Sequence, residues 1–302
     1  MAVLEITNLT KRFGKFTALN GVNMELNEGE VFGFIGPNGA GKSTTIRILL
    51  GILKATNGKA TIFGKNVWSD AVEIHKSLAY VPGDVNLWPN LTGGEVIDLF
   101  GSLRGGIDKQ KREELIKRFD LDPTKKCRTY SKGNRQKVAL VAAFASDADL
   151  YILDEPTSGL DPLMEQIFQQ CVLEAKQNGK SVLLSSHILS EVEKLCDRVG
   201  IIRQGEIIET GTLDELRHLT RTNLRVETKK PIINLHDIPG VHELEGTDYA
   251  VSFQVDSEQL ELVIKHISQF GIVKLESTPP TLEDLFMRHY ETQGEKGVGG
   301  RS

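Results

Sequence analysis

Apolar and polar positions follow two different patterns along the chain. From residue 1 to about residue 218, short apolar runs rich in β-branched residues alternate with helical stretches, as in an α/β domain. From residue 219 to about residue 290, apolar and polar positions alternate singly, as in half-buried strands. The strands expected in the first part are VLEITNL, EVFGFIG, SLAYVP, LYILDE, SVLLSS and VGIIRQGEIIETG. The pattern predicts a large α/β domain over 1–218 and a smaller α+β domain over 219–290.

The second part combines three expected strands with two expected helices. The strands are NLRVETKK, YAVSFQVD and GIVKLEST. A helix is predicted over roughly 257–270, because its apolar residues recur every three or four positions on one face. Those residues are Leu260, Val263, Ile264 and Ile267. A last helix is expected after Pro280, where Thr281 and Asp284 have the spacing of a capping box. The Gly-rich residues 291–302 are predicted to form a disordered tail.

Composition indicates a soluble protein of a reducing compartment. The 302 residues are 39% hydrophobic and 25% charged. The longest apolar runs, such as VALVAAFA at 138–145, are too short to span a bilayer. The N-terminal residues have no apolar segment typical of a signal peptide, so secretion is not expected. The three cysteines lie far apart without a zinc or disulfide spacing and are expected to be thiols in the cytosol.

The charge balance argues against nucleic acid as a partner. The net charge is −5 and the isoelectric point is near 5.9. Residues 223–290 contain six Lys and Arg against eleven Asp and Glu, so the second domain is no more basic than the first. Binding to nucleic acid relies on a basic surface, which this composition does not favour. Any membrane association is therefore expected to go through a partner.

A phosphate-binding loop is predicted at residues 36–44. The segment GPNGAGKST matches the pattern G-x-x-x-x-G-K-[ST], and it lies between an expected strand and an expected helix. Its glycines allow the backbone to turn N–H groups toward phosphate oxygens, Lys42 reaches the β- and γ-phosphates, and Ser43 is a ligand for Mg²⁺. The nucleotide-binding candidates here are Gly36, Pro37, Asn38, Gly39, Ala40, Gly41, Lys42, Ser43 and Thr44. The alternative is a chance match on a Gly-rich turn.

Two carboxylates end the apolar strand in DLYILDEPT (149–157). Asp154 closes the strand and suits a direct or indirect contact to Mg²⁺. Glu155 points differently and is a candidate general base for an attacking water. A strand that simply runs into an acidic turn is the alternative interpretation.

These motifs, in their order, resemble the nucleotide-binding subunit of an ATP-binding cassette (ABC) transporter over about residues 3–218. GPNGAGKST resembles its Walker A loop and LYILDEPT its Walker B strand. SGLD (158–161) resembles its D-loop, SSH (185–187) its switch-histidine segment, and YSKGNRQ (130–136) a variant of its LSGGQ signature. The resemblance implies a P-loop NTPase fold with a RecA-like core, an antiparallel β subdomain and a helical subdomain at about 86–145. The second domain resembles an accessory domain of multidrug, antibiotic and lipid exporters.

The resemblance implies roles for individual residues. Glu155 would be the general base and His187 would position the γ-phosphate and water, with ATP and Mg²⁺ as cofactors. Phe13 would stack on adenine, and Ser131, Gly133 and Asn134 would face a nucleotide held by a partner. From the residues alone, Phe13 or His187 can also be an ordinary core side chain, and Asp161 can be only a helix N-cap.

Two positions depart from the family pattern. Gly83, followed by Asp84, stands where the family has a Gln that contacts Mg²⁺ and water. Either that contact is lost, or Asp84 or water replaces it. Lys132 stands where the signature has its first Gly, and it brings either a further positive charge at the phosphate or a side chain that only meets solvent.

The resemblance also implies partners and a function. With one Walker A loop per chain, the second cassette must be another polypeptide, either an identical copy or a related subunit. A separate permease would dock on the helical subdomain, with Trp88, Leu91 and Arg128 as contact candidates; Trp88 and Leu91 can equally form a small local core. The expected function is an ATPase that powers export through that permease, cytoplasmic and peripheral on the inner face of the membrane. The alternatives are a soluble ABC ATPase that acts as a non-transport switch, and a non-catalytic ATP-gated binding module.

Overall fold

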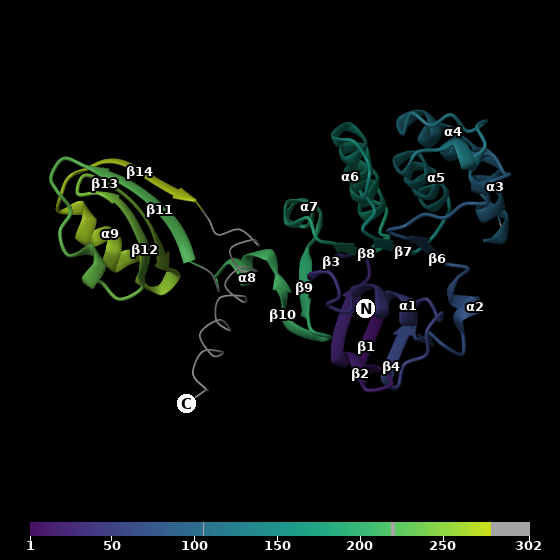
Figure 1. The fold of residues 1–302 in the computed structure, drawn as a ribbon, viewed down its shortest axis with the longest axis horizontal. Helices are drawn as coiled ribbons and strands as arrows, with labels where there is room; N and C mark the ends of the chain where they lie inside the picture. Colours follow the sequence, from purple (N-terminus) through teal and green to yellow (C-terminus); the bar gives the residue numbers. More distant parts are fainter. Residues whose placement is uncertain (105, 219–220, 279–302) are drawn as a thin grey trace. The chain divides into compact units, whose positions relative to one another are not determined.

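A computed structural model describes residues 1–104, 106–218 and 221–278 (Figure 1). The chain divides into two compact units, Met1–Thr210 and Gly211–Ser302. The sequence predicts this boundary at residue 218, but helix α8 (Leu213–His218) belongs to the second unit. The helix expected after Pro280 and the tail 291–302 lie outside the described residues.

A six-stranded sheet forms the centre of the first unit. Its strand order is β10-β9-β3-β8-β7-β6, and the pairs β9/β3, β3/β8, β8/β7 and β7/β6 are parallel. Every residue of β3, β7 and β8 is buried, as expected of strands covered on both faces. The strands are β3 (Val31–Ile35), β6 (Leu78–Val81), β7 (Leu150–Asp154), β8 (Ser181–Ser186), β9 (Arg198–Arg203) and β10 (Glu206–Thr212). Since parallel strands end at the same edge, the residues that follow β3, β7 and β8 lie along that edge.

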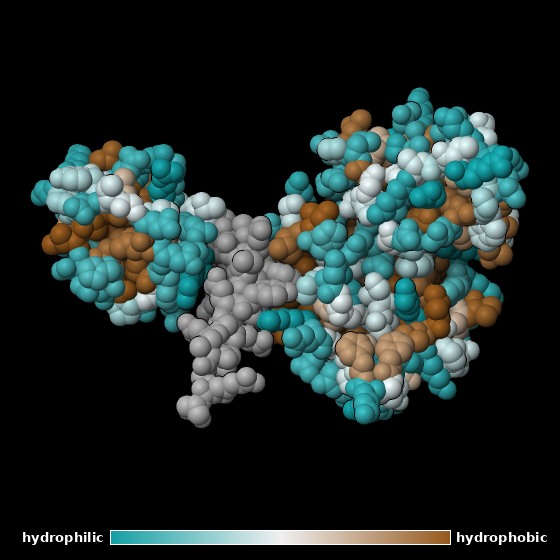
Figure 2. All heavy atoms as spheres, viewed as in Figure 1, coloured by the Kyte–Doolittle hydropathy of each residue, from teal (hydrophilic) through white to brown (hydrophobic). Residues whose placement is uncertain are grey.

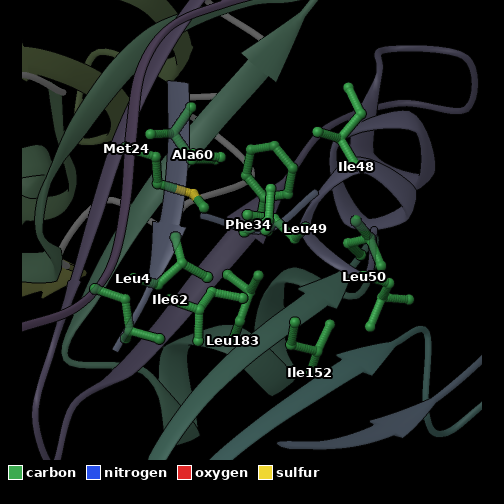
Figure 3. Close-up of a cluster of buried hydrophobic side chains, with 14 of the residues drawn as sticks. Leu4, Met24, Phe34, Ile48, Leu49, Leu50, Ala60, Ile62, Ile152 and Leu183 are labelled. Carbon is green, nitrogen blue, oxygen red and sulfur yellow. The ribbon is translucent and has the colours of Figure 1, made fainter. Parts of the chain in front are cut away.

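A second, antiparallel sheet packs against this core. Its order is β2-β1-β4-β5, with β1 (Ala2–Phe13), β2 (Phe16–Asn27), β4 (Asn57–Ile62) and β5 (Lys65–Asn66). Only part of β1 is predicted from the sequence. The long β1–β2 hairpin contains several register shifts, so its side chains do not keep a simple two-residue alternation. In Figure 3, Leu4, Met24 and Ile62 of this sheet meet residues of β3, β7, β8 and α1 in one apolar cluster.

Helices cover the central sheet on both sides. Figure 1 shows α5 and α6 on one side, and α1 with the antiparallel sheet on the other. The helices are α1 (Lys42–Leu49), α2 (Ala71–Ile74), α3 (Gly93–Leu103), α4 (Lys109–Arg118), α5 (Lys132–Phe144), α6 (Pro162–Gln177) and α7 (Leu189–Leu195). A 3₁₀ turn, Cys127–Thr129, precedes α5. The last nine residues of α5, from Gln136 to Phe144, are all buried, so this helix is anchored firmly in the unit.

The second unit has its own sheet, helix and core. Strands β11 (Arg221–Thr228), β12 (Val241–Thr247), β13 (Ala250–Asp256) and β14 (Ile272–Thr278) have the order β12-β13-β11-β14, with antiparallel pairs. Helix α9 (Leu260–Ser268) follows a 3₁₀ turn at Ser257–Gln259 and buries Val263 and Ile267 in the core. A further 3₁₀ turn spans Leu235–Asp237. Strand β12 was not predicted from the sequence; it lies at the sheet edge and is mostly exposed, so it has no apolar alternation.

The visible surface of both units is mainly hydrophilic, with scattered apolar patches (Figure 2). Among the described helices, none combines the length and the apolar character needed to cross a membrane. All three cysteines are buried free thiols.

Candidate functional site

The phosphate loop (residues 36–44) connects β3 to α1, in the strand–loop–helix context that the motif requires. A Cβ at Gly36 would overlap the carbonyl oxygen of Ile202. Gly41 has φ +118° and a Cβ there would lie 2.7 Å from Leu19 Cδ2. Both positions therefore require glycine, and the loop keeps its shape because the chain packs closely around it.

Lys42 lies inside the phosphate loop with only 5% of its surface exposed. Its Nζ donates hydrogen bonds to the carbonyl oxygens of Gly36 and, at 3.2 Å, Pro37. Burial lowers the pKa of Lys42, while the nearby Glu155 and Asp154 oppose that shift. A buried ammonium with only carbonyl acceptors is poorly compensated, so a phosphate group is a favourable further partner.

Asp154 ends β7 with 8% of its surface exposed. Burial raises its pKa, and the hydroxyls of Ser185 and Ser43 beside it partly oppose the shift. Asp154 Oδ1 and Ser185 Oγ are nevertheless buried without a hydrogen bond of ordinary geometry to any described residue. Unsatisfied carboxylate and hydroxyl oxygens next to Ser43 fit a hard cation such as Mg²⁺, which takes oxygen ligands from few side chains and from phosphates. Among the described residues, no group of three or more His, Cys, Asp and Glu side chains could hold a metal ion.

Glu155 and His187 lie together at the sheet edge. Glu155 has φ +48°, a backbone conformation that costs energy for a residue with a side chain, and its N–H donates to Ser185 O at 2.8 Å. Its Oε1 lies 3.4 Å from His187 Nδ1, and the side chains are 30% and 58% exposed. The half-exposed His187 is not a core histidine. The structure thus gathers Lys42, Asp154, Glu155 and His187 into one neighbourhood.

Gly83 belongs to the same neighbourhood. A Cβ there would lie 3.1 Å from Asp154 O and 3.4 Å from Glu155 Cβ. The position where the family pattern has its Gln therefore lies beside the backbone of Asp154 and the Cβ of Glu155. Asp84 is exposed, and no described hydrogen bond or ion pair links it to Glu155 or His187.

The signature segment (residues 130–136) begins helix α5. Ser131 is the N-cap, and its Oγ accepts the N–H of Asn134 at 3.2 Å. Because that hydroxyl accepts, its own hydrogen is free to donate to a ligand. A Cβ at Gly133 would overlap the carbonyl oxygen of Gly159, so the signature backbone touches the D-loop-like SGLD segment (residues 158–161).

Two side chains of α5 reinforce this contact. Lys132 Nζ donates to Ser158 Oγ at 2.6 Å, and Gln136 Nε2 donates to Pro156 O at 2.9 Å. Lys132 therefore does not simply meet solvent. Within the described residues, no hydrogen bond or ion pair joins the signature segment to the phosphate loop of the same chain.

The positions of Phe13 and Asp161 bear on whether each is an ordinary structural residue. Phe13 ends β1 with 50% of its surface exposed, and Lys11 Nζ lies 5.0 Å from its ring centroid, so it is not a core phenylalanine. Its hairpin partner Phe16 lies two residues before Ala18, whose carbonyl oxygen would lie 3.2 Å from a Cβ at Gly41 in the phosphate loop. Asp161 caps α6, accepting the N–H groups of Leu163 and Met164 at 3.1 and 3.0 Å.

Sequence reasoning missed several polar residues that support the site. Ser185 precedes the switch-segment histidine by two residues, and its unsatisfied hydroxyl next to Asp154 has no signal in the sequence. Glu191, four residues after His187, is buried; Ser186 Oγ donates to it at 2.7 Å. Burial raises the pKa of Glu191, while the hydroxyls of Ser186 and Thr157 lower it. Only its position four residues after His187, in the first turn of α7, could have suggested a link.

The three permease-contact candidates lie on neighbouring segments of the first unit. Arg128 is exposed and its N–H donates to Pro89 O at 3.3 Å, while Cys127 N–H donates to Leu91 O at 2.8 Å. Trp88 is 50% exposed and its ring centroid lies 6.0 Å from that of Phe100. The segment therefore combines a local aromatic contact with exposed surface, which fits both interpretations of Trp88.

Two family models match separate parts of the chain. The model described as "ABC transporter" matches residues 19–158, and the model described as "ATP-binding protein DrrA1-3-like, C-terminal domain" matches residues 211–290. The second match begins at the boundary between the two structural units.

Full-length relatives and a solved structure agree with these matches. The linearmycin resistance ATP-binding protein LnrL of Bacillus subtilis is 32% identical over 94% of this chain and 97% of its own length. The bacitracin transport ATP-binding protein BcrA of Bacillus licheniformis is 31% identical over 95% and 96%. The dimeric, ADP- and Pi-bound structure of the ATP-binding cassette MJ0796 has a TM-score of 0.64 and 26% identity, covering 70% of this chain and 98% of that one.

These similarities confirm the predicted P-loop cassette fold and the predicted family. The phosphate loop, Asp154, Glu155 and His187 lie along one edge of the central sheet, and residues 130–136 begin α5. The chain belongs to the ATP-binding subunits of ABC transporters, and it is an ATPase of that family.

Proposed function

We propose that two cassettes bind Mg-ATP head to tail and power a separate permease that exports a drug, an antibiotic, a lipid or another small molecule. One observation carries the proposal: the phosphate loop has its catalytic candidates beside it, whereas the signature segment is bonded to the SGLD segment and not to that loop. The nucleotide site of one chain is then complete on one side only. The missing side is the signature helix of a second cassette, for which a second copy of this chain is the simplest choice.

In this arrangement the chain's own half binds and activates. Lys42 and the N–H groups of the phosphate loop hold the phosphates, and the N-terminus of α1 adds its positive end. Ser43 and Asp154 would hold Mg²⁺, which would neutralise phosphate charge. Glu155 accepts the proton of the attacking water, and His187, 3.4 Å from that carboxylate, orients the water and the γ-phosphate.

The partner's half closes the site. Ser131 donates its free hydroxyl hydrogen to the γ-phosphate, while Gly133 allows backbone approach and Asn134 lies on the same first turn of α5. Phe13 is exposed and available to stack on adenine. Because charge on the γ-phosphate is met from both sides, ATP favours association of the cassettes and hydrolysis removes that stabilisation.

The transport part of the proposal rests on the relatives and the second unit. Two full-length relatives are named for antibiotic resistance or transport, and the second unit matches the C-terminal domain of DrrA1-3-like proteins. A permease contacting Trp88, Leu91 and Arg128 would hold the subunit on the cytoplasmic face of the membrane. We assign the second unit a regulatory or dimer-stabilising role, since its described residues contain none of the catalytic motifs.

Concentration dependence of hydrolysis tests the shared site. If two chains build each site, ATPase activity per mole of chain rises with protein concentration until the dimer is saturated. A constant activity per mole across the dilution series would contradict it. For transport, the chain should co-purify with a membrane subunit encoded beside its gene and be stimulated by it; hydrolysis unaffected by any such subunit would favour the non-transport switch.

A further inference from the structure

The signature segment of this chain is bonded to the loop that follows Glu155. Lys132 Nζ donates to Ser158 Oγ at 2.6 Å, and the N–H of Ser158 donates to the carbonyl oxygen of Glu155 at 3.1 Å. Two hydrogen bonds in series therefore connect the Lys132 ammonium to the backbone of the candidate general base. No other signature side chain reaches Ser158 within the described residues.

The aliphatic part of Lys132 adds a packing contact. Its Cγ and Cδ would each lie 3.4 Å from a Cβ built on Gly159, so the stem crosses this glycine closely. Gly159 has φ +83° and turns the chain back toward α5, where its carbonyl oxygen touches Gly133. A glycine at position 132, as in the family signature, would provide neither the stem nor the ammonium.

Glu155 needs such support because its backbone is held in an unfavourable conformation. Its φ is +48°, and such a conformation persists where surrounding contacts fix it. The carbonyl oxygen of Ser185 accepts its N–H, the N–H of Ser158 donates to its carbonyl oxygen, and Gln136 Nε2 donates to the carbonyl oxygen of the next residue, Pro156. Lys132 is the one participant of this set whose residue type departs from the family signature.

We propose that Lys132 is a positioning residue that couples the signature segment to Glu155 through Ser158. This inference rests on the proposed function, in which the signature of one chain meets the nucleotide of its partner while Glu155 serves the nucleotide of its own chain. Contact with the partner's phosphate then constrains α5, Lys132 constrains Ser158, and Ser158 constrains Glu155. In each chain of a dimer, the Lys132–Ser158 bond then links the two ATP sites, alongside the Gln136–Pro156 bond of the same helix.

The charge of Lys132 has a competing use, direct attraction to the partner's γ-phosphate. The two roles differ in what Ser158 does. If Lys132 acts through Ser158, removing either group has the same consequence and removing both adds nothing further. If Lys132 acts on phosphate, Ser158 is irrelevant and nucleotide affinity carries the effect.

The test compares Lys132→Met, Ser158→Ala, the double variant and Lys132→Arg in the full-length chain, using steady-state Mg-ATP hydrolysis. Lys132→Met keeps the stem and removes the ammonium. We expect kcat to fall about three- to tenfold in both single variants with KM for ATP unchanged, the double variant to equal the single ones, and Lys132→Arg to recover part of the rate. The matched control is Lys59→Met, an exposed lysine on β4 outside the site, which should retain wild-type kcat and KM.

Three results would overturn the inference. An increased KM in Lys132→Met with a silent Ser158→Ala would assign the ammonium to phosphate. Multiplying losses in the double variant would make the two residues independent, and wild-type kinetics in both single variants would make the bond irrelevant. Failure of the proposed function itself is seen separately, as a wild-type chain whose hydrolysis per mole does not depend on concentration.

Discussion

Two glycine-containing loops in this chain open helices, and they differ in where their lysines go. In the phosphate loop, Lys42 is 5% exposed and turned inward to Gly36 and Pro37, beside both carboxylates. In the signature segment, Lys132 is exposed and turned along the surface to Ser158. The first loop holds a buried ammonium beside its own backbone carbonyls, whereas the second presents a helix start, a hydroxyl hydrogen available for donation and a bond to Ser158.

The comparison shows that a Gly- and Lys-containing helix start does not by itself form a phosphate-binding site. The phosphate loop lies at the sheet edge, where the ends of β3, β7 and β8 bring other chemistry to it. The signature segment lies on a helix whose buried residues anchor it elsewhere in the unit. The signature segment contacts the loop that follows Glu155. Within the described residues, no hydrogen bond joins it directly to a catalytic side chain of its own chain.

The largest effect is expected from removing the general base Glu155, which should abolish most hydrolysis but leave ATP binding intact. Glu155→Gln keeps the shape of the side chain but removes the base, so kcat should fall about 10²- to 10⁴-fold while ATP still binds. With ATP retained, this variant should accumulate as a dimer in light scattering. Turnover at the wild-type rate would contradict the general-base role.

The next largest effect is expected on ATP affinity when Lys42, the buried lysine of the phosphate loop, is removed. Lys42→Ala should weaken ATP binding about a hundredfold, because charge-assisted hydrogen bonds to phosphate contribute about 1.5–3 kcal/mol. Calorimetric titration with ATP measures this directly, and Lys59→Ala is the matched loss of an exposed charge. If affinity for ATP is the same in both variants, the loop does not bind phosphate as described.

A smaller effect is expected from crowding the signature segment. Gly133→Ala forces a Cβ against Gly159 O, and relieving such overpacking costs about 1–3 kcal/mol, enough to lower hydrolysis about tenfold. The phosphate loop is not touched, so the isolated chain should bind ATP with wild-type affinity. Equal losses of binding and hydrolysis would show that the two loops are not separate halves.

The smallest effect concerns the position aligned with the missing Gln. Gly83→Ala places a Cβ 3.1 Å from Asp154 O, so a shift of a few tenths of an ångström should lower kcat about two- to fivefold. Asp84→Ala should stay within about twofold of wild type, since Asp84 is exposed and lacks a described link to the catalytic pair. A larger loss in Asp84→Ala than in Gly83→Ala would identify Asp84 as the replacement for that Gln.

Sequence reasoning succeeds here where the chemistry is contiguous. GPNGAGKST directly follows a strand and LYILDEPT contains a strand end, each with its functional side chains, and parallel strands place such ends at one edge. Contacts between residues far apart in the sequence are harder to predict. The partner of Lys132 is 26 residues away in the sequence, and the unsatisfied oxygens of Asp154 and Ser185 come from different strands.

The fold shows the same limit. The buried strands β3, β7 and β8 are continuous apolar runs and were predicted, but β2, β4 and β12 were not. Register shifts in the β1–β2 hairpin and exposure of the edge strand β12 remove the alternation on which such a prediction depends. The domain boundary was placed eight residues late because α8 shares the helical texture of the first unit.

The central claim is that the signature segment completes the site of another chain, and mixing two defective chains tests it most directly. One chain carries Lys42→Ala and the other Gly133→Asp, both in the Glu155→Gln background. Alone, each should stay monomeric with Mg-ATP. Mixed, they should form a dimer with ATP, because the loop of the second chain meets the intact signature of the first. A mixture that stays monomeric at concentrations where Glu155→Gln alone is dimeric would contradict the account.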